Sequence, residues 1–194
     1  EKRIKRMRLN TVCTDRVAGA AVMTQHLTSL GLKNLLVVSG EDTASYDKEM
    51  LDELRNSTKK SKNFDSVHFT VAGLPKAGEK FDFQAIENFL RPPHRSDAII
   101  VLNSTLVFPL YLALQEKNIR IPQDVALVSM EDGIGFDLLT TPVTRLRRPL
   151  PAMSLKVANI IWSEVKNQGK SKYKRQVNMS PELLIRSSCG SYQK

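Results

Sequence analysis

The sequence has few cysteines and lacks any apolar run long enough to cross a membrane. Its longest apolar stretches, such as residues 98–102, have the length of a strand. The basic residues 1–8 have no apolar segment behind them, so they do not resemble a secretory signal peptide. We therefore expect a cytoplasmic protein, or an excised piece of a larger one, with no membrane partner.

Signals for metal binding and catalysis are also scarce. Cys13 and Cys189 lie near opposite ends of the chain without C-x-x-C spacing, which favours neither a disulfide framework nor a metal site. The sequence contains no G-x-S-x-G and no P-loop, and D-G-I-G-F-D at residues 132–137 lacks the third glycine of a dinucleotide fingerprint. The three histidines stand alone in a helix, a strand and a Pro-rich turn. We expect a protein that is not an enzyme and uses no cofactor.

Basic residues outnumber acidic ones by 29 to 20, which gives a formal net charge of +9. Such an excess can indicate contact with nucleic acid. Here much of it lies in residues 1–8, 59–62 and 170–175, which we assign to loops and ends. These clusters contain no interleaved aromatics and no DNA-reading motif, so we interpret them as solvated faces.

Strand and helix patterns alternate along most of the chain. Short apolar runs predict strands at residues 9–14, 35–39, 67–72, 98–102, 125–128 and 144–149. Helices are predicted from Asp15 to Gly31, to about residue 56, over 82–90, from residue 104, and over 152–166, with a surface turn at 58–63. Pro109 predicts a distorted helix start, and a strand pair is expected at 176–179 and 183–186. This order predicts an α/β fold, with a parallel sheet and helices on both faces.

One stretch is specific enough to indicate a family. Residues 118–149 combine R-x-P-x-D-V, a buried strand, an acidic pair and T-P-x-T-x-x-R-x-P, and residues 15–35 and 181–190 agree with the same pattern. The chain resembles the effector-binding domain of the LacI/GalR family of bacterial transcription regulators, which is periplasmic-binding-protein-like of type I. The resemblance implies a small-molecule effector, such as a sugar or sugar derivative, a homodimer, and operator DNA bound through a headpiece that this chain does not contain.

The resemblance also implies a division of the chain, in which residues 1–194 form a partial effector-binding and dimerisation domain. The C-terminal lobe would comprise about residues 16–142 and 176–190. Residues 9–15 would cross between lobes, and residues 143–167 would return toward a first lobe that is mostly missing. The helix containing Trp162 should then expose apolar surface, or bury it against another copy.

Three loops, at residues 40–46, 103–104 and 131–132, should meet at the carboxyl edge of the sheet. The resemblance implies that ligand lies across them, held by an arginine, an asparagine and two aspartates. Asn103 matches the asparagine, Ser104 and Glu131 replace the aspartates, and Tyr46 stands where the arginine is expected. Asp15 and Asp132 complete the acidic candidates. Helix caps at residues 15 and 103, and a turn at 132–133, explain the same residues structurally.

Without the arginine, the site lacks a fork that grips two ligand oxygens. Arg16 and Arg147 are placed to favour an anionic ligand instead, such as a phosphorylated sugar or a sugar acid. The family's subunit-pairing regions correspond to four leucines, which as isolated residues also fit a core: Leu106, Leu110, Leu138 and Leu139. Two alternatives remain open, namely a solute-binding component of a sugar transporter or chemoreceptor, and a dimerisation scaffold that has lost its ligand.

Overall fold

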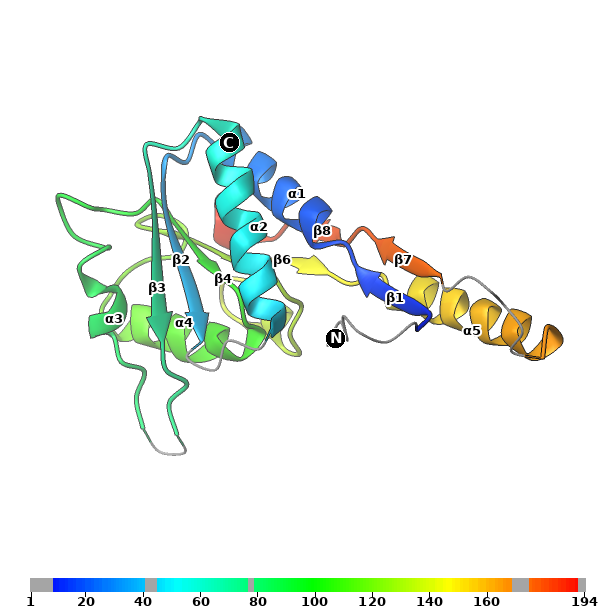
Figure 1. The fold of residues 1–194 in the computed structure, drawn as a ribbon. Helices are drawn as coiled ribbons and strands as arrows, with labels where there is room; N and C mark the ends of the chain where they lie inside the picture. Colours follow the sequence, from blue (N-terminus) through cyan, green and yellow to red (C-terminus); the bar gives the residue numbers. More distant parts are fainter. Residues whose placement is uncertain (1–8, 41–44, 77–78, 169–174, 192–194) are drawn as a thin grey trace.

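A mostly parallel sheet forms the centre of the molecule (Figure 1). The computed structural model describes residues 9–40, 45–76, 79–168 and 175–191, without the side chains of 45–47. The strands in sheet order are β3 (Ser66–Ala72), β2 (Asn34–Gly40), β4 (Ala98–Val101), β5 (Ala126–Ser129), β6 (Thr144–Arg147) and β8 (Glu182–Leu184). All neighbours pair in parallel except β6 and β8, which are antiparallel. The predicted fold class is confirmed.

Helices cover both faces of this sheet, because alternate strand residues point to opposite sides. In β2, Leu36 and Val38 face one core, which α3 (Gln84–Glu87) and α4 (Val107–Glu116) complete. Leu35 and Val37 face a second core, completed by α1 (Arg16–Ser29) and α2 (Ser45–Ser61). With apolar contacts on both faces, the central strands are fully buried and hold the loops at their carboxyl ends in fixed positions.

Three predicted helix boundaries are confirmed by local geometry. The Asp15 carboxylate accepts a hydrogen bond of 3.0 Å from the Ala18 backbone N–H, as an N-cap does. Gly31 follows α1 with a φ of +77°, a backbone conformation that glycine adopts without strain. A 3₁₀ turn, η1 (Ser104–Leu106), precedes α4, and Pro109 falls in the first turn of α4, where its missing N–H removes no helical hydrogen bond.

Two helix predictions were wrong. Helix α2 continues to Ser61, so most of the predicted turn at 58–63 is helical, and Thr58 is buried with its hydroxyl donating to the Leu54 carbonyl at 2.8 Å. The helix predicted over 82–90 contracts to the four residues of α3. After α3, backbone N–H groups donate to the carbonyl of the third preceding residue, as in a 3₁₀ turn. The Ser96 N–H donates to the Phe89 carbonyl, so the α-helical hydrogen-bond pattern does not continue.

The predicted terminal strand pair was also wrong. β7 (Gln176–Met179) pairs in parallel with β1 (Thr11–Thr14), while β8 pairs with β6. The buried Pro181 lies between β7 and β8 and packs against α1 at Gly19, at the point where the two strands enter different sheets.

The β1–β7 ribbon and α5 (Leu150–Lys166) extend away from the main sheet (Figure 1). Helix α5 exposes large apolar side chains, including Ile161 at 58%, Trp162 at 63% and Val165 at 65% of their surface. The predicted apolar exposure around Trp162 is therefore confirmed. Across the described segments, none of the helices has both the length and the apolarity to cross a membrane.

Candidate functional site

The loops that follow β4 and β5 meet at the carboxyl edge of the sheet. The Glu131 carboxylate accepts hydrogen bonds from the Ser104 backbone N–H at 3.0 Å and from the Ser104 hydroxyl at 3.1 Å. The Ser129 hydroxyl donates to the Glu131 carbonyl at 2.8 Å, which fixes the second loop on its own strand. Two of the three predicted loops are therefore joined directly, whereas residues 41–44 and the Tyr46 side chain lie outside the described part of the chain.

Asn103 sits beside this junction and caps η1. Its amide oxygen accepts hydrogen bonds from the Thr105 backbone N–H at 2.9 Å and the Thr105 hydroxyl at 2.6 Å. The structural interpretation of Asn103 as a helix cap is confirmed. Its amide oxygen is already occupied within the chain, so its NH₂ group is the part available to a ligand.

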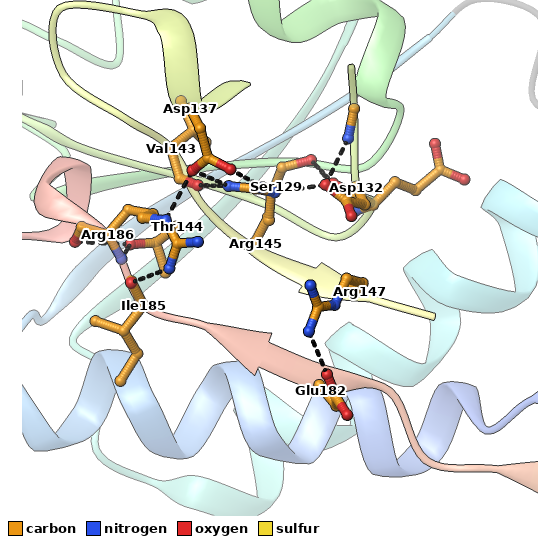
Figure 2. A network of polar contacts seen from close by, with 12 residues as sticks. Ser129, Asp132, Asp137, Val143, Thr144, Arg145, Arg147, Glu182, Ile185 and Arg186 are labelled. Carbon is orange, nitrogen blue, oxygen red and sulfur yellow. Dashed lines mark hydrogen bonds and ion pairs between the residues drawn. The ribbon is translucent and has the colours of Figure 1, made fainter. Parts of the chain in front are cut away.

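The second acidic residue, Asp132, belongs to an ion-pair network (Figure 2). At its centre is Arg145, which is only 5% exposed, and whose Nε donates to Asp132 Oδ1. The two terminal nitrogens of Arg145 donate to the Asp137 carboxylate at 3.0 and 2.7 Å. Arg186 adds a bond from its Nε to Asp137 Oδ1 at 2.7 Å. Asp132 is thus held by a buried guanidinium from the neighbouring strand.

Sequence reasoning missed Arg145, although one signal could have identified it. An arginine inside a predicted buried strand must be paired, because an unpaired buried charge is costly. The Arg145 hydrogen bonds, followed by those from Arg186, hold the pKa of Asp137 far below its ordinary value. The Asp137 bonds in turn raise the pKa of Arg145, so each of these two residues favours the charged form of the other.

A cavity of about 880 Å³ opens beside Asp132. Its walls are the loop at 132–134, the end of β6 with residues 147–149, the first turn of α5, and Glu182 of β8. Arg147 lies on this wall, where a terminal nitrogen of its guanidinium donates to Glu182 at 2.8 Å in an exposed ion pair (Figure 2). Asp132 and Arg147 therefore share one cavity, as neighbouring candidates for contact with a ligand.

The other two candidates lie in a separate cavity of about 270 Å³, between β1 and the starts of α1 and α2. There Arg16 forms an ion pair of 3.0 Å with Glu49, close to Asp15. Asp52 and Glu53 also line this cavity, so its surroundings are acidic. Arg16 therefore does not share the cavity of Arg147, and its acidic surroundings do not favour an anionic ligand.

Two of the four leucines, for which the sequence allowed either a subunit interface or a core, belong to the core. Leu106 and Leu110 are 0% exposed in a single chain and belong to the core beneath α4, because positions four apart on a helix share a face. The outer face of α4 instead exposes Phe108 (36%) and Leu112 (56%). Leu138, in the 3₁₀ turn η2 (Phe136–Leu138), is 89% exposed, and Leu139 is half-buried against the core.

A further contact joins residues that the sequence separates widely. Cys189, in the 3₁₀ turn η3 (Ser187–Cys189), places its Sγ 3.3 Å from His26 Nε2 and 2.9 Å from the Ser191 hydroxyl. Burial alone would raise the pKa of this thiol, but hydrogen bonds from His26, Ser191 and Thr144 outweigh it and lower the pKa to about 6. The Cys189 thiol is therefore buried and held by hydrogen bonds from residues far apart in the sequence.

Comparison with known proteins decides the family. Residues 24–189 match the periplasmic binding protein-like domain. This chain belongs to that family. The HTH-type transcriptional regulator DegA of Bacillus subtilis is 22% identical over 187 residues, which cover 93% of this chain and 52% of DegA. The HTH-type transcriptional repressor PurR of Haemophilus influenzae is 22% identical over 177 residues, covering 89% and 51% respectively.

A solved LacI-family transcriptional regulator from Enterococcus faecium, with bound ribose, has the same fold. Its TM-score is 0.73 at 18% identity, covering 92% of this chain and 64% of that one. The LacI/GalR resemblance found in the sequence is thereby confirmed for this periplasmic binding protein-like chain. The chain spans about half the length of the curated relatives that it matches.

Proposed function

We propose that this chain is the effector-binding and dimerisation portion of a LacI/GalR-type transcription regulator that acts on operator DNA in the cytoplasm. The observation that supports this most directly is the cavity beside Asp132, at the carboxyl edge of the sheet, where open α/β sheets bind ligands. Its polar groups suit a sugar or sugar derivative, and the Enterococcus faecium relative binds ribose. The proposed role is sensing, without catalysis.

The cavity also suggests how a ligand could be coupled to the rest of a regulator. One wall belongs to the sheet edge, and the opposite wall is the first turn of α5. A ligand that touches both walls binds best when they have one particular separation. It therefore shifts the population toward that closure state, and a changed subunit geometry would alter the grip on DNA.

We further propose that residues 143–167 return the chain into a first lobe, and that residues 9–15 cross from it. The exposed apolar side chains of α5 then pack against that lobe in the full-length protein. An apolar cavity of about 570 Å³ between β1 and α5, lined by residues including Val12 and Ile160, supports a lobe in contact with both elements.

We propose that a homodimer forms through Phe108, Leu112 and Leu138. A Cβ added at Gly135, beside η2, would lie 3.2 Å from the Phe108 ring, so the outer face of α4 and the η2 region are neighbours. Leu112→Asp in the full-length protein should convert dimers to monomers in sedimentation experiments. Val71→Asp, at a 53% exposed position on the edge strand β3, is the matched control and should leave the dimer intact.

The reading frame upstream of Glu1 provides the first test of the regulator proposal. A helix-turn-helix headpiece followed by the rest of a first lobe would support it. An apolar signal sequence would instead favour the solute-binding component of a transporter or chemoreceptor. If a headpiece is found, the affinity of the full-length protein for DNA from upstream of the gene should change when the effector is added. Fluorescence anisotropy of labelled DNA measures this affinity.

A ligand-less scaffold is the second candidate, and one observation favours it. The carboxylate of Glu131, the amide oxygen of Asn103 and one oxygen of Asp132 are each occupied by groups of the same chain. Calorimetric titration of the full-length protein with ribose and related sugars separates the two readings, because a scaffold should produce no binding heat with any of them.

A further inference from the structure

We infer that the cavity beside Asp132 selects an effector with an anionic group, a phosphate or a carboxylate, and that Arg147 and Arg148 determine this preference, with Arg145 neutralising Asp132. The inference rests on the proposed effector-binding function and specifies the chemical class of the effector. It depends on which polar groups of the cavity the chain has already paired, and which it has left open.

The negative groups of the cavity are already engaged. Asp132 shares one carboxylate oxygen with the buried Arg145, which is bound in addition to Asp137. Glu182 accepts from Arg147. A neutral sugar is held largely by carboxylates that accept from its hydroxyls, so this pairing lowers the capacity of the site for neutral sugars.

The positive groups of the cavity are less fully used. Arg148 is exposed, lines the cavity and forms no ion pair with any residue that the structure describes. Arg147 donates only one of its five N–H groups to Glu182. A phosphate or carboxylate could accept from both guanidiniums, and such charge-assisted hydrogen bonds are stronger than bonds between neutral groups.

The charges of the cavity lining also favour an anionic ligand. Its arginines, at positions 145, 147 and 148, outnumber its carboxylates, Asp132 and Glu182, by three to two. Arg145 offsets the repulsion that Asp132 would exert on an anion. The adjoining helix α5 has no acidic residue in its first turn, so nothing there opposes a negative group.

Calorimetric titration of the full-length protein tests the inference with four probes: ribose, ribose 5-phosphate, ribonate and inorganic phosphate. We expect one or both anionic sugars to bind about tenfold or more tightly than ribose, as one charge-assisted contact implies, with affinity falling as salt rises. Phosphate and carboxylate are distinguished by comparing ribose 5-phosphate with ribonate. Equal affinity for ribose and both anionic sugars, or no binding of any anionic probe, would overturn the inference.

Arg148→Gln should abolish most of the preference for the anionic sugar over ribose, so the ratio of the two affinities is the quantity to compare. Arg95→Gln is the matched control, because Arg95 is exposed just before β4, at the opposite, amino edge of the sheet. If both variants behave like the wild type, Arg148 does not determine specificity.

Asp132→Asn tests whether the affinity for the anionic sugar rises or falls. Under the inference it removes a negative charge and strengthens binding of the anionic sugar, with Arg145 still held by Asp137. If Asp132 is instead a simple acceptor for sugar hydroxyls, the same change weakens all sugars, which overturns the inference. Ribose binding that alters DNA affinity would still support the effector-sensing proposal, so the two failures are distinguishable.

Discussion

Replacing Gly133 by alanine should destabilise the fold through one steric contact. Gly133 follows Asp132, and its backbone lies against the ring of Phe136, which is 1% exposed in the core beneath α4. A Cβ at position 133 would lie 2.5 Å from Phe136 Cε1 and 3.0 Å from Cε2. Real Cβ contacts are longer, so either the ring or the loop must move.

The magnitude follows from how firmly the ring is held. Phe136 packs edge to face with Phe108, at 5.5 Å between ring centroids, so it has little freedom to retreat. Overpacking of this kind costs about 1 to 3 kcal/mol. For a protein of this size, each kcal/mol lowers Tm by roughly 2 to 4 °C. Urea and thermal unfolding, followed by circular dichroism, can measure such an effect.

Gly40→Ala is the matched control, because the nearest atom to its new Cβ is a Leu106 methyl at 3.9 Å, an ordinary contact. A smaller side chain at position 136 should relieve the clash, so Gly133→Ala and Phe136→Leu together should cost at least ~0.5 kcal/mol less than the sum of the single changes. If Gly133→Ala matches the control, or if the free energies of the two changes simply add, the Phe136 ring does not clash with a Cβ at position 133.

Three other predictions concern the network, the core and α5. Because the folded pKa of Asp137 is depressed, its stabilising contribution is complete above the unfolded pKa of about 3.9 and is lost as pH falls below it. The unfolding free energy of Asp137→Asn should therefore depend less steeply on pH below about 3.9 than that of the wild type. An unchanged slope would mean that ionised Asp137 does not stabilise the fold. Ser188→Ala leaves the buried Thr144 N–H without the hydroxyl that accepts it at 2.9 Å, so it should cost about 1 to 3 kcal/mol in urea unfolding, and a change within ±0.5 kcal/mol would contradict the assignment. Subtracting the emission of the Trp162→Phe variant from that of the full-length protein isolates the fluorescence of Trp162. This fluorescence should resist quenching by acrylamide, whereas ready quenching would mean that no lobe covers α5.

The fold was predictable because its signals are local. Apolar runs of strand length and helix caps such as Asp15 depend on neighbouring residues, and the order of the elements implies a parallel sheet. The errors arose where distant segments decide the outcome. β7 pairs with β1 across more than 160 residues, and no pattern within either strand specifies that partner.

The site was only partly predictable for the same reason. The meeting of Ser104 with Glu131 follows from neighbouring parallel strands that end at the same edge. The pairing of Arg145 with Asp132 and Asp137 depends on the path of η2, which the sequence does not define. Spacing also gave no warning that Arg16 would bind Glu49 instead of facing the cavity of Arg147.

The packing of Arg145 indicates which part of the site can move. Its guanidinium lies 5.9 Å from the centroid of the Phe136 ring and is fixed by two carboxylates, so the charged wall of the cavity is continuous with the core. The opposite wall is α5, where Met153 and Ile160 are the only buried side chains. A change in closure should therefore displace α5 and leave the Arg145 network in place. Ligand should then alter the fluorescence of Trp162, while hydrogen exchange around η2 remains unchanged.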